Sequence, residues 1–269
     1  AGYAPTSAIT ARASEDLLLV QWPGAGDEQL RLGLSIVDGT PTIAELAVQS
    51  GGAAWTTLAT DAKIEFTVTE GFRRISNQQL RPLRDLGVAL TQDVIDKYKW
   101  DVFWDAPLDL RAEVGGGNPP PPEGVAEQPG LPRSPDEIRR ADAIYDASGC
   151  AVTTDGARLA VTFPGMRLGS FSGALALTVY EGTNLIRVEA VASTDLPSVA
   201  YKYDLGLTGL DTEGSNVVWR DIANQEHAYA LRGPANTDRV ALRAANRLVV
   251  AETNGGAIAA FPPPHTFFW

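Results

Sequence analysis

The sequence predicts an all-β protein of antiparallel strands with few short helices. Glycine follows an acidic or amide residue between two strand-like runs at Asp38-Gly39, Asp155-Gly156, Glu181-Gly182 and Asn254-Gly255. A glycine at such a position supplies the positive φ angle that tight hairpin turns require. Within the runs, apolar and polar residues alternate, which is typical of antiparallel strands that bury one face and expose the other.

The alternation is clearest in two consecutive runs between residues 175 and 190. The apolar residues that share a face in these runs are Leu175, Leu177, Val179, Ile186, Val188 and Ala190. Arg187 and Glu189 occupy the opposite face of the second run. Because side chains alternate between the two faces of a strand, we expect the six apolar residues in the core and the charged pair outside it.

Two segments predict short helices, and the tract between them predicts a loop. "TQDVIDKYKW" (91–100) has apolar residues at helical spacing after a threonine. "RSPDEIRRA" (133–141) offers Ser134 as N-cap and Pro135 as the first helical residue, for one or two turns. The Pro- and Gly-rich tract 115–135 cannot hold a strand ladder. It is either a linker or a long surface loop, and we favour a loop within one domain spanning 1–269, because similar strands flank it.

Net charge and hydropathy disfavour several classes of partner. The net charge of −11 over 269 residues disfavours nucleic acid and anionic membrane surfaces, since both need a basic footprint. No apolar run approaches the roughly 20 residues that cross a bilayer, so we expect no membrane insertion. The first residues, "AGYAPTSA", are small and neutral, as after signal cleavage. They predict a secreted or periplasmic protein, and the abundance of Arg, Ala and Gly indicates a bacterial one.

We expect neither a metal site nor a cofactor. Cys150 is the only cysteine, which rules out an intrachain disulfide and a cysteine-based zinc site, and its β-like context predicts a buried, inert thiol. The sequence has no Gly-rich phosphate loop and no HExxH motif. The Asp-Gly pairs belong to hairpins and not to calcium loops.

Several stretches together resemble the galactose mutarotase-like fold. They are "LRLGLSIVDGTPTIAELAV", "DGARLAVTFPG", "GALALTVYEGTNLIRVEAVAST" and "SVAYKYDLGL". The resemblance implies a large antiparallel β super-sandwich whose paired sheets carry a sugar on a concave face. This fold recurs in aldose epimerases, in domains of glycoside hydrolases and phosphorylases, and in polysaccharide lyases, so a carbohydrate is the implied partner.

The stretch "SVAYKYDLGL" (198–207) is a candidate for that sugar surface. Alternation places Tyr201 and Tyr203 on one face of a strand, and Lys202 and Asp204 on the other. One interpretation buries both tyrosines in the core and leaves a solvated Lys202 face, and the other uses the tyrosine rings and hydroxyls, or Lys202, to bind sugar. We expect the tyrosines to be buried and Lys202 to lie near Arg220 or Glu226.

Two further stretches carry candidate site residues. In "EGFRRISNQQLRPLRD" (70–85), Arg73 and Arg74 could hold the carboxylate of an acidic sugar, or could merely balance an acidic surface. In "VVWRDIANQEHAYALRG" (217–233), Trp219 and Arg220 are candidate sugar contacts. The candidate acid, base and assisting residue there are Asp221, Glu226 and His227. The alternative is that these residues have separate structural roles.

These observations predict an exported carbohydrate-active domain that binds a poly- or oligosaccharide. If it cleaves the glycan, the reaction is hydrolysis or elimination, between which the sequence does not choose. Two alternatives stay open. One is a non-catalytic extracellular structural protein that assembles into a homo-oligomer, and the other is a glycan-binding accessory module.

Overall fold

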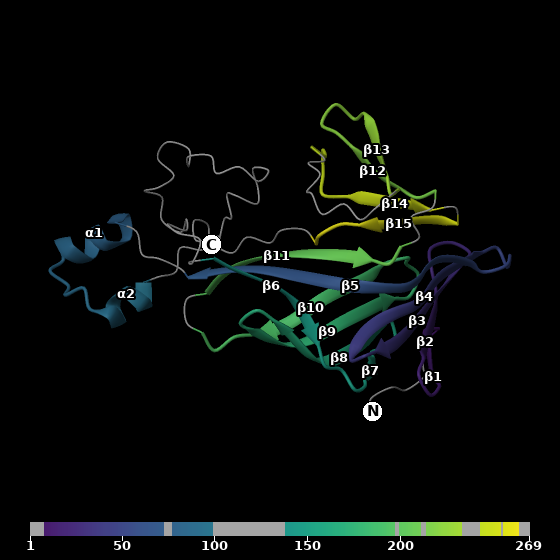
Figure 1. The fold of residues 1–269 in the computed structure, drawn as a ribbon, viewed down its shortest axis with the longest axis horizontal. Coiled ribbons are helices and arrows are strands. Elements are labelled where there is room, and N and C mark those ends of the chain that lie inside the picture. The colour runs from purple at the N-terminus through teal and green to yellow at the C-terminus, as the bar shows by residue number, and fades with distance from the viewer. Residues whose placement is uncertain are drawn as a thin grey trace.

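The computed structural model describes residues 8–72, 77–98, 138–196, 199–210, 214–232, 243–253 and 255–263. It confirms the predicted all-β fold: antiparallel strands make up two sheets, and the described residues contain two short helices (Figure 1). The predicted loop 115–135 lies outside the described residues. Within the described part, neither helix is long and apolar enough to cross a membrane.

The elements are, in chain order, β1 (Thr10–Ala13), β2 (Leu18–Pro23), β3 (Glu28–Val37), β4 (Thr40–Ser50), β5 (Thr56–Phe72), α1 (Asn77–Asp85), α2 (Gln92–Tyr98), β6 (Ile138–Tyr145), β7 (Ala151–Thr154), β8 (Arg158–Leu168), β9 (Phe171–Tyr180), β10 (Ile186–Ser193), β11 (Val199–Thr208), β12 (Asn216–Arg220), β13 (Glu226–Ala230), β14 (Val249–Thr253) and β15 (Gly256–Ala260).

The larger sheet folds over on itself at β6 to make a sandwich. Its strand order is β1-β2-β3-β4-β5-β6-β8-β9-β10, with β11 paired to β5 and β7 paired to β8. The first five residues of β6 pair with β5, whereas its last three pair with β8. Hydrogen bonds then join β2, near one end of this path, to the turn between β9 and β10, near the other. The Trp22 indole N–H donates to the carbonyl of Thr183 at 2.9 Å, and the Gly182 N–H donates to the carbonyl of Pro23. β2 therefore lies against the turn between β9 and β10.

The core lies between the two layers, and the alternation predicts which residues enter it. Leu175, Leu177 and Val179 are almost completely buried, and Ile186, Val188 and Ala190 pack against the same core, as expected. Arg187 lies outside and forms an ion pair with Glu189. From the other layer, β5 contributes Ile64, Phe66 and Val68. Each such side chain contributes roughly 1.5–3 kcal/mol by leaving water.

The predicted hairpin turns are confirmed where the structure describes them. Asp38 and Gly39 both have positive φ angles, 49° and 77°, as a two-residue type I′ turn requires. Gly182 has a φ angle of 76° in the turn between β9 and β10. Asn254 lies outside the described residues, but the strands on either side of it pair, with Thr253 opposite Gly256.

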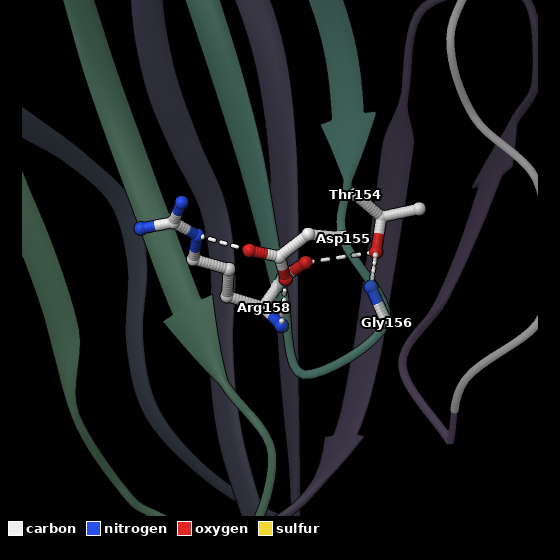
Figure 2. Close-up of polar contacts among 4 residues, drawn as sticks. All are labelled: Thr154, Asp155, Gly156 and Arg158. Carbon is white, nitrogen blue, oxygen red and sulfur yellow. Dashed lines mark hydrogen bonds and ion pairs between the residues drawn. The ribbon is translucent and has the colours of Figure 1, made fainter.

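The turn between β7 and β8 is held by side chains as well as by its glycine, as Figure 2 shows. The Asp155 carboxylate accepts hydrogen bonds from the backbone N–H of Arg158 at 3.1 Å and from its Nε at 2.6 Å. The Thr154 hydroxyl donates to the Arg158 carbonyl and accepts from the Gly156 N–H. These local bonds fix the register between a four-residue strand and its neighbour.

The helix predictions were right for one segment and wrong for the other. α2 forms as predicted, and the Thr91 hydroxyl accepts from the Val94 N–H at its start. α1 was not predicted. The helix expected from Ser134 is wrong from Ile138 onward, because β6 begins there and pairs with β5. A strand ladder to a buried neighbour outweighs a local N-cap signal.

Cys150 is exposed, so the prediction of a buried thiol is wrong. It lies just before β7, a strand of four residues that pairs only with β8 among the described residues. A short strand at the border of a sheet has no neighbour on its outer side to bury its side chains.

The smaller sheet has the order β13-β12-β14-β15 and adjoins the sandwich through β15 (Figure 1). Ile258 of β15 packs against the edge of the main core, as does Leu58 of β5. At Gly255 an added Cβ would lie 2.9 Å from the Thr57 carbonyl oxygen, so the backbones approach closely there. That both sheets belong to one domain spanning 1–269 stays a prediction.

Replacement of Trp22 tests the join between the layers. Trp22 is fully buried, so Trp22→Ala should lower the free energy of unfolding by about 3–5 kcal/mol. Trp22→Phe keeps most of the packing but leaves the Thr183 carbonyl without its donor, and should cost about 1–3 kcal/mol. Urea unfolding measures both. The control Val37→Ala, at an exposed position, should change stability by less than about 0.5 kcal/mol. A Trp22→Phe variant as stable as the wild type would contradict this role.

Candidate functional site

The hairpin of β12 and β13 gathers five of the predicted site residues. Its register places Trp219 opposite His227 and Arg220 opposite Glu226. The Trp219 and His227 rings stack, with centroids 5.5 Å apart and planes 19° from parallel. Because directly opposite residues share a face of a sheet and successive residues alternate, Trp219 and His227 lie on one face, and Arg220 and Glu226 on the other.

Asp221 is held in place by the turn that follows β12. One carboxylate oxygen accepts the backbone N–H groups of Ala223 and Gln225, both at 2.9 Å, and the other lies 2.8 Å from Nε2 of His227. The hydrogen bond from His227, followed by that from Gln225, lowers the pKa of Asp221. Asp221 therefore stays ionised and orients His227, and it is unsuited to donate a proton.

The second candidate carboxylate turns to a different partner. Glu226 forms an ion pair with Arg220 at 2.9 Å, and the Arg220 guanidinium also donates to the Asn224 carbonyl. Asp221 and Glu226 thus contact different residues, one on the His227 side of the hairpin and one on the Arg220 side. These contacts give no support to a shared acid–base pair. That Asp221, Glu226 and His227 are catalytic stays a prediction.

The structure of β11 shows how far Tyr201 and Tyr203 are buried. The ladder with β5 places Tyr201 opposite Glu70 and Tyr203 opposite Val68, on the core side of the sheet, as alternation predicted. Both tyrosines are nevertheless 56% and 52% exposed, so the prediction that they are buried is wrong. Among the described residues, β11 pairs with one strand only, so its side chains have a neighbouring strand of the sheet on one side and none on the other. Tyr201 packs edge-on against Phe171, with ring centroids 5.1 Å apart.

The other predicted binding residues lie on β11 or outside the described residues, and the proximity of Lys202 to Arg220 or Glu226 stays a prediction. Lys202 is half-buried on the outer side of β11, opposite Thr69, whereas Arg220 and Glu226 belong to the smaller sheet. Asp204, two residues along the same side, lies 3.8 Å from Arg140 of β6. Arg73 and Arg74 lie outside the described residues.

Sequence reasoning missed the buried carboxylate of Glu70. Glu70 is 6% exposed and accepts hydrogen bonds from the backbone N–H of Ser170 at 2.6 Å and from its hydroxyl at 2.9 Å. A Cβ at Gly169 would lie 2.2 Å from this carboxylate, so only glycine fits beside it. The alternation that starts at Ile64 places Glu70 on the buried face, and this signal was present in the sequence. Its role is to tie the β8–β9 turn to β5.

Two further features define the surroundings of the hairpin. The indole N–H of Trp219 is buried and has no hydrogen-bond acceptor among the described residues. Tyr229, opposite Val217 and therefore on the Trp219 side, is 38% exposed. Among the described residues, no group of three or more His, Cys, Asp or Glu side chains could hold a metal ion.

The lowered pKa of Asp221 predicts a pH-dependent effect of Asp221→Asn. The folded state keeps the carboxylate ionised at pH values where the unfolded chain takes up a proton. The ionised Asp221 carboxylate therefore stabilises the fold fully at pH values above the pKa of this carboxyl in the unfolded chain, about 4. This stabilisation is lost as the pH falls through its lower pKa in the folded protein. Urea midpoints should separate wild type from variant at pH 7 and converge in acid.

Asp195→Asn, at an exposed site in the β10–β11 connection, is the control and should give the wild-type midpoint throughout. A constant difference between wild type and Asp221→Asn at every pH would contradict the prediction.

Comparison with known proteins assigns this chain to no family. No protein-family model matches it, and no curated protein matches it at a significant level. The resemblance to the galactose mutarotase-like fold therefore stays a prediction, because a sheet-rich fold is not enough to identify that superfamily.

Proposed function

We propose that this protein binds a neutral oligosaccharide, without cleaving it, on the side of the smaller sheet that carries Trp219, His227 and Tyr229. We call this surface the aromatic face. The observation that supports it is the stacked Trp219–His227 pair beside an ionised, fixed Asp221 and an exposed Tyr229.

The chemistry of these groups suits a sugar. A pyranose ring presents apolar C–H groups on its faces and hydroxyl groups at its rim. Aromatic side chains with a polar tip cover the former and hydrogen-bond the latter. The Asp221 carboxylate accepts hydrogen bonds from hydroxyl groups. One surface thus offers aromatic rings for stacking and a carboxylate acceptor.

Binding fits these contacts better than cleavage. Glycoside hydrolysis needs a carboxylic acid of raised pKa together with a second carboxylate. Hydrogen bonds lower the pKa of Asp221 instead, and Glu226 is engaged by Arg220. These contacts therefore favour a non-catalytic glycan-binding module over an enzyme that cleaves the glycan.

The charge near the aromatic face favours a neutral ligand. The face carries the Asp221 anion, and the whole chain has a net charge of −11. Like charges close together repel, so a uronate polymer would meet an unfavourable field. A secreted or periplasmic location, where glycan polymers are encountered, belongs to the same proposal.

A glycan array on the purified protein, followed by calorimetry on the best ligand, tests the proposal. Tyr229→Ala should weaken binding at least tenfold, equivalent to about 1.4 kcal/mol, because the exposed ring loses its contact with the sugar. The control Ile144→Ala removes a 59% exposed side chain on β6 and should leave the affinity unchanged.

Two outcomes would count against this function. The first is full affinity in Tyr229→Ala, which would move the ligand away from the aromatic face. The second is release of reducing ends or of unsaturated uronates from the ligand, abolished by Asp221→Asn, which would make the hairpin a catalytic site.

A further inference from the structure

The edge strand β11 has a surface that the glycan proposal leaves unexplained. Among the described residues, this ten-residue strand pairs only with β5, and it lies at the border of the larger sheet (Figure 1). Tyr201, Tyr203 and Leu205 on its core side are 56%, 52% and 48% exposed. On its other side, a Cβ added to Gly206 would meet nothing within 4 Å. A long edge with exposed apolar residues is a template for another strand.

We propose that β11 pairs antiparallel with β11 of a second copy of this chain, about a two-fold axis through Tyr203. The inference rests on the sequence of the strand, "VAYKYDLGLT". Antiparallel pairing about Tyr203 would place the following residues opposite one another: Val199 and Leu207, Ala200 and Gly206, Tyr201 and Leu205, Lys202 and Asp204, and Tyr203 with itself. Each apolar residue then lies opposite an apolar residue or glycine. Lys202 of each copy lies opposite Asp204 of the other, which gives two pairs of opposite charge.

The charges select this register over its neighbours. To keep the tyrosine sides of both copies on one face, the register can shift only so that the axis passes through another residue of β11. An axis through Lys202 opposes Lys202 with itself, and one through Asp204 opposes two carboxylates. Like charges directly opposite one another destabilise a strand pair. Of these three adjacent registers, the one about Tyr203 avoids both clashes.

The ion pair that Asp204 forms within its own chain is compatible with this pairing. Asp204 has a 61% exposed side chain, and its distance of 3.8 Å from Arg140 leaves oxygen lone pairs for a second cation. A lysine on an edge strand ordinarily discourages the addition of other strands. In the proposed pair, Lys202 of each copy lies opposite Asp204 of the other copy, so that its charge is compensated. The self-complementarity makes a copy of this chain the occupant, in a closed two-fold contact.

Charge reversal at the two positions tests the pairing. We expect the wild type to form a dimer in sedimentation equilibrium. Lys202→Asp alone, or Asp204→Lys alone, should weaken dimerisation at least tenfold, since each opposes like charges twice. The double variant Lys202→Asp with Asp204→Lys restores opposite charges and should regain the dimer. Arg187→Glu, on the outer side of β10, is the control and should dimerise like the wild type.

Single cysteines in a Cys150→Ser background locate the axis. Directly opposite Cα atoms in an antiparallel pair lie about 4.5–5.5 Å apart, within the range of a disulfide. Tyr203→Cys should therefore cross-link with itself under oxidation. Tyr201→Cys should not, but it should cross-link to a Leu205→Cys chain when the two are mixed.

Three results would overturn the inference. They are a monomer at high concentration, a dimer that survives both single charge reversals, and self-cross-linking through Tyr201→Cys in place of Tyr203→Cys. None of these variants alters Trp219, His227 or Tyr229, so glycan binding and pairing can succeed or fail independently.

Discussion

Burial of one face of β5 is the constraint on which the rest of this structure depends. The strand runs for 17 residues and pairs with β4 and then β6 along one edge and with β11 along the other. Ile64, Phe66 and Val68 point from it into the core, and a register shift of one residue would expose all three. The face that β5 buries therefore also determines which faces of its neighbours β4, β6 and β11 point to the core.

The buried face of β5 ends in a charge. Glu70 continues the series that starts at Ile64, and a buried carboxylate is tolerated only where hydrogen bonds satisfy it. The Ser170 N–H and hydroxyl do so, and Gly169 gives them room. One polar contact between distant parts of the chain thus fixes the β8–β9 turn against β5, where an apolar contact would be less specific in direction.

The two candidate surfaces differ in how they are held. In the β12–β13 hairpin, Asp221 is fixed by groups within six residues of it, so the Trp219–His227 stack is organised locally. On β11, the tyrosine side is defined only by the ladder to β5, and its exposure reflects the absence of a further strand among the described residues. We propose a small ligand for the first surface, because its contacts are local and already formed. For the second surface we propose a partner strand, because β11 pairs only with β5 among the described residues.

The sequence by itself determined what depends on neighbours along the chain. Alternation placed Leu175, Leu177 and Val179 in the core, and the acidic-residue–glycine pairs placed the turns, since both effects act over a few residues. Alternation also put Tyr201 and Tyr203 on one side of a strand and Lys202 on the other, and this division is confirmed.

Only the tertiary structure decided which strands have neighbours on both sides. Strand pairing leaves Tyr201, Tyr203 and Cys150 exposed. It also makes residues 138–141 the start of strand β6, where a local cap signal indicated a helix. It also brings Glu70 to Ser170 across 100 residues of sequence. Burial depends on what packs against a residue from elsewhere in the chain, and local periodicity does not carry that information.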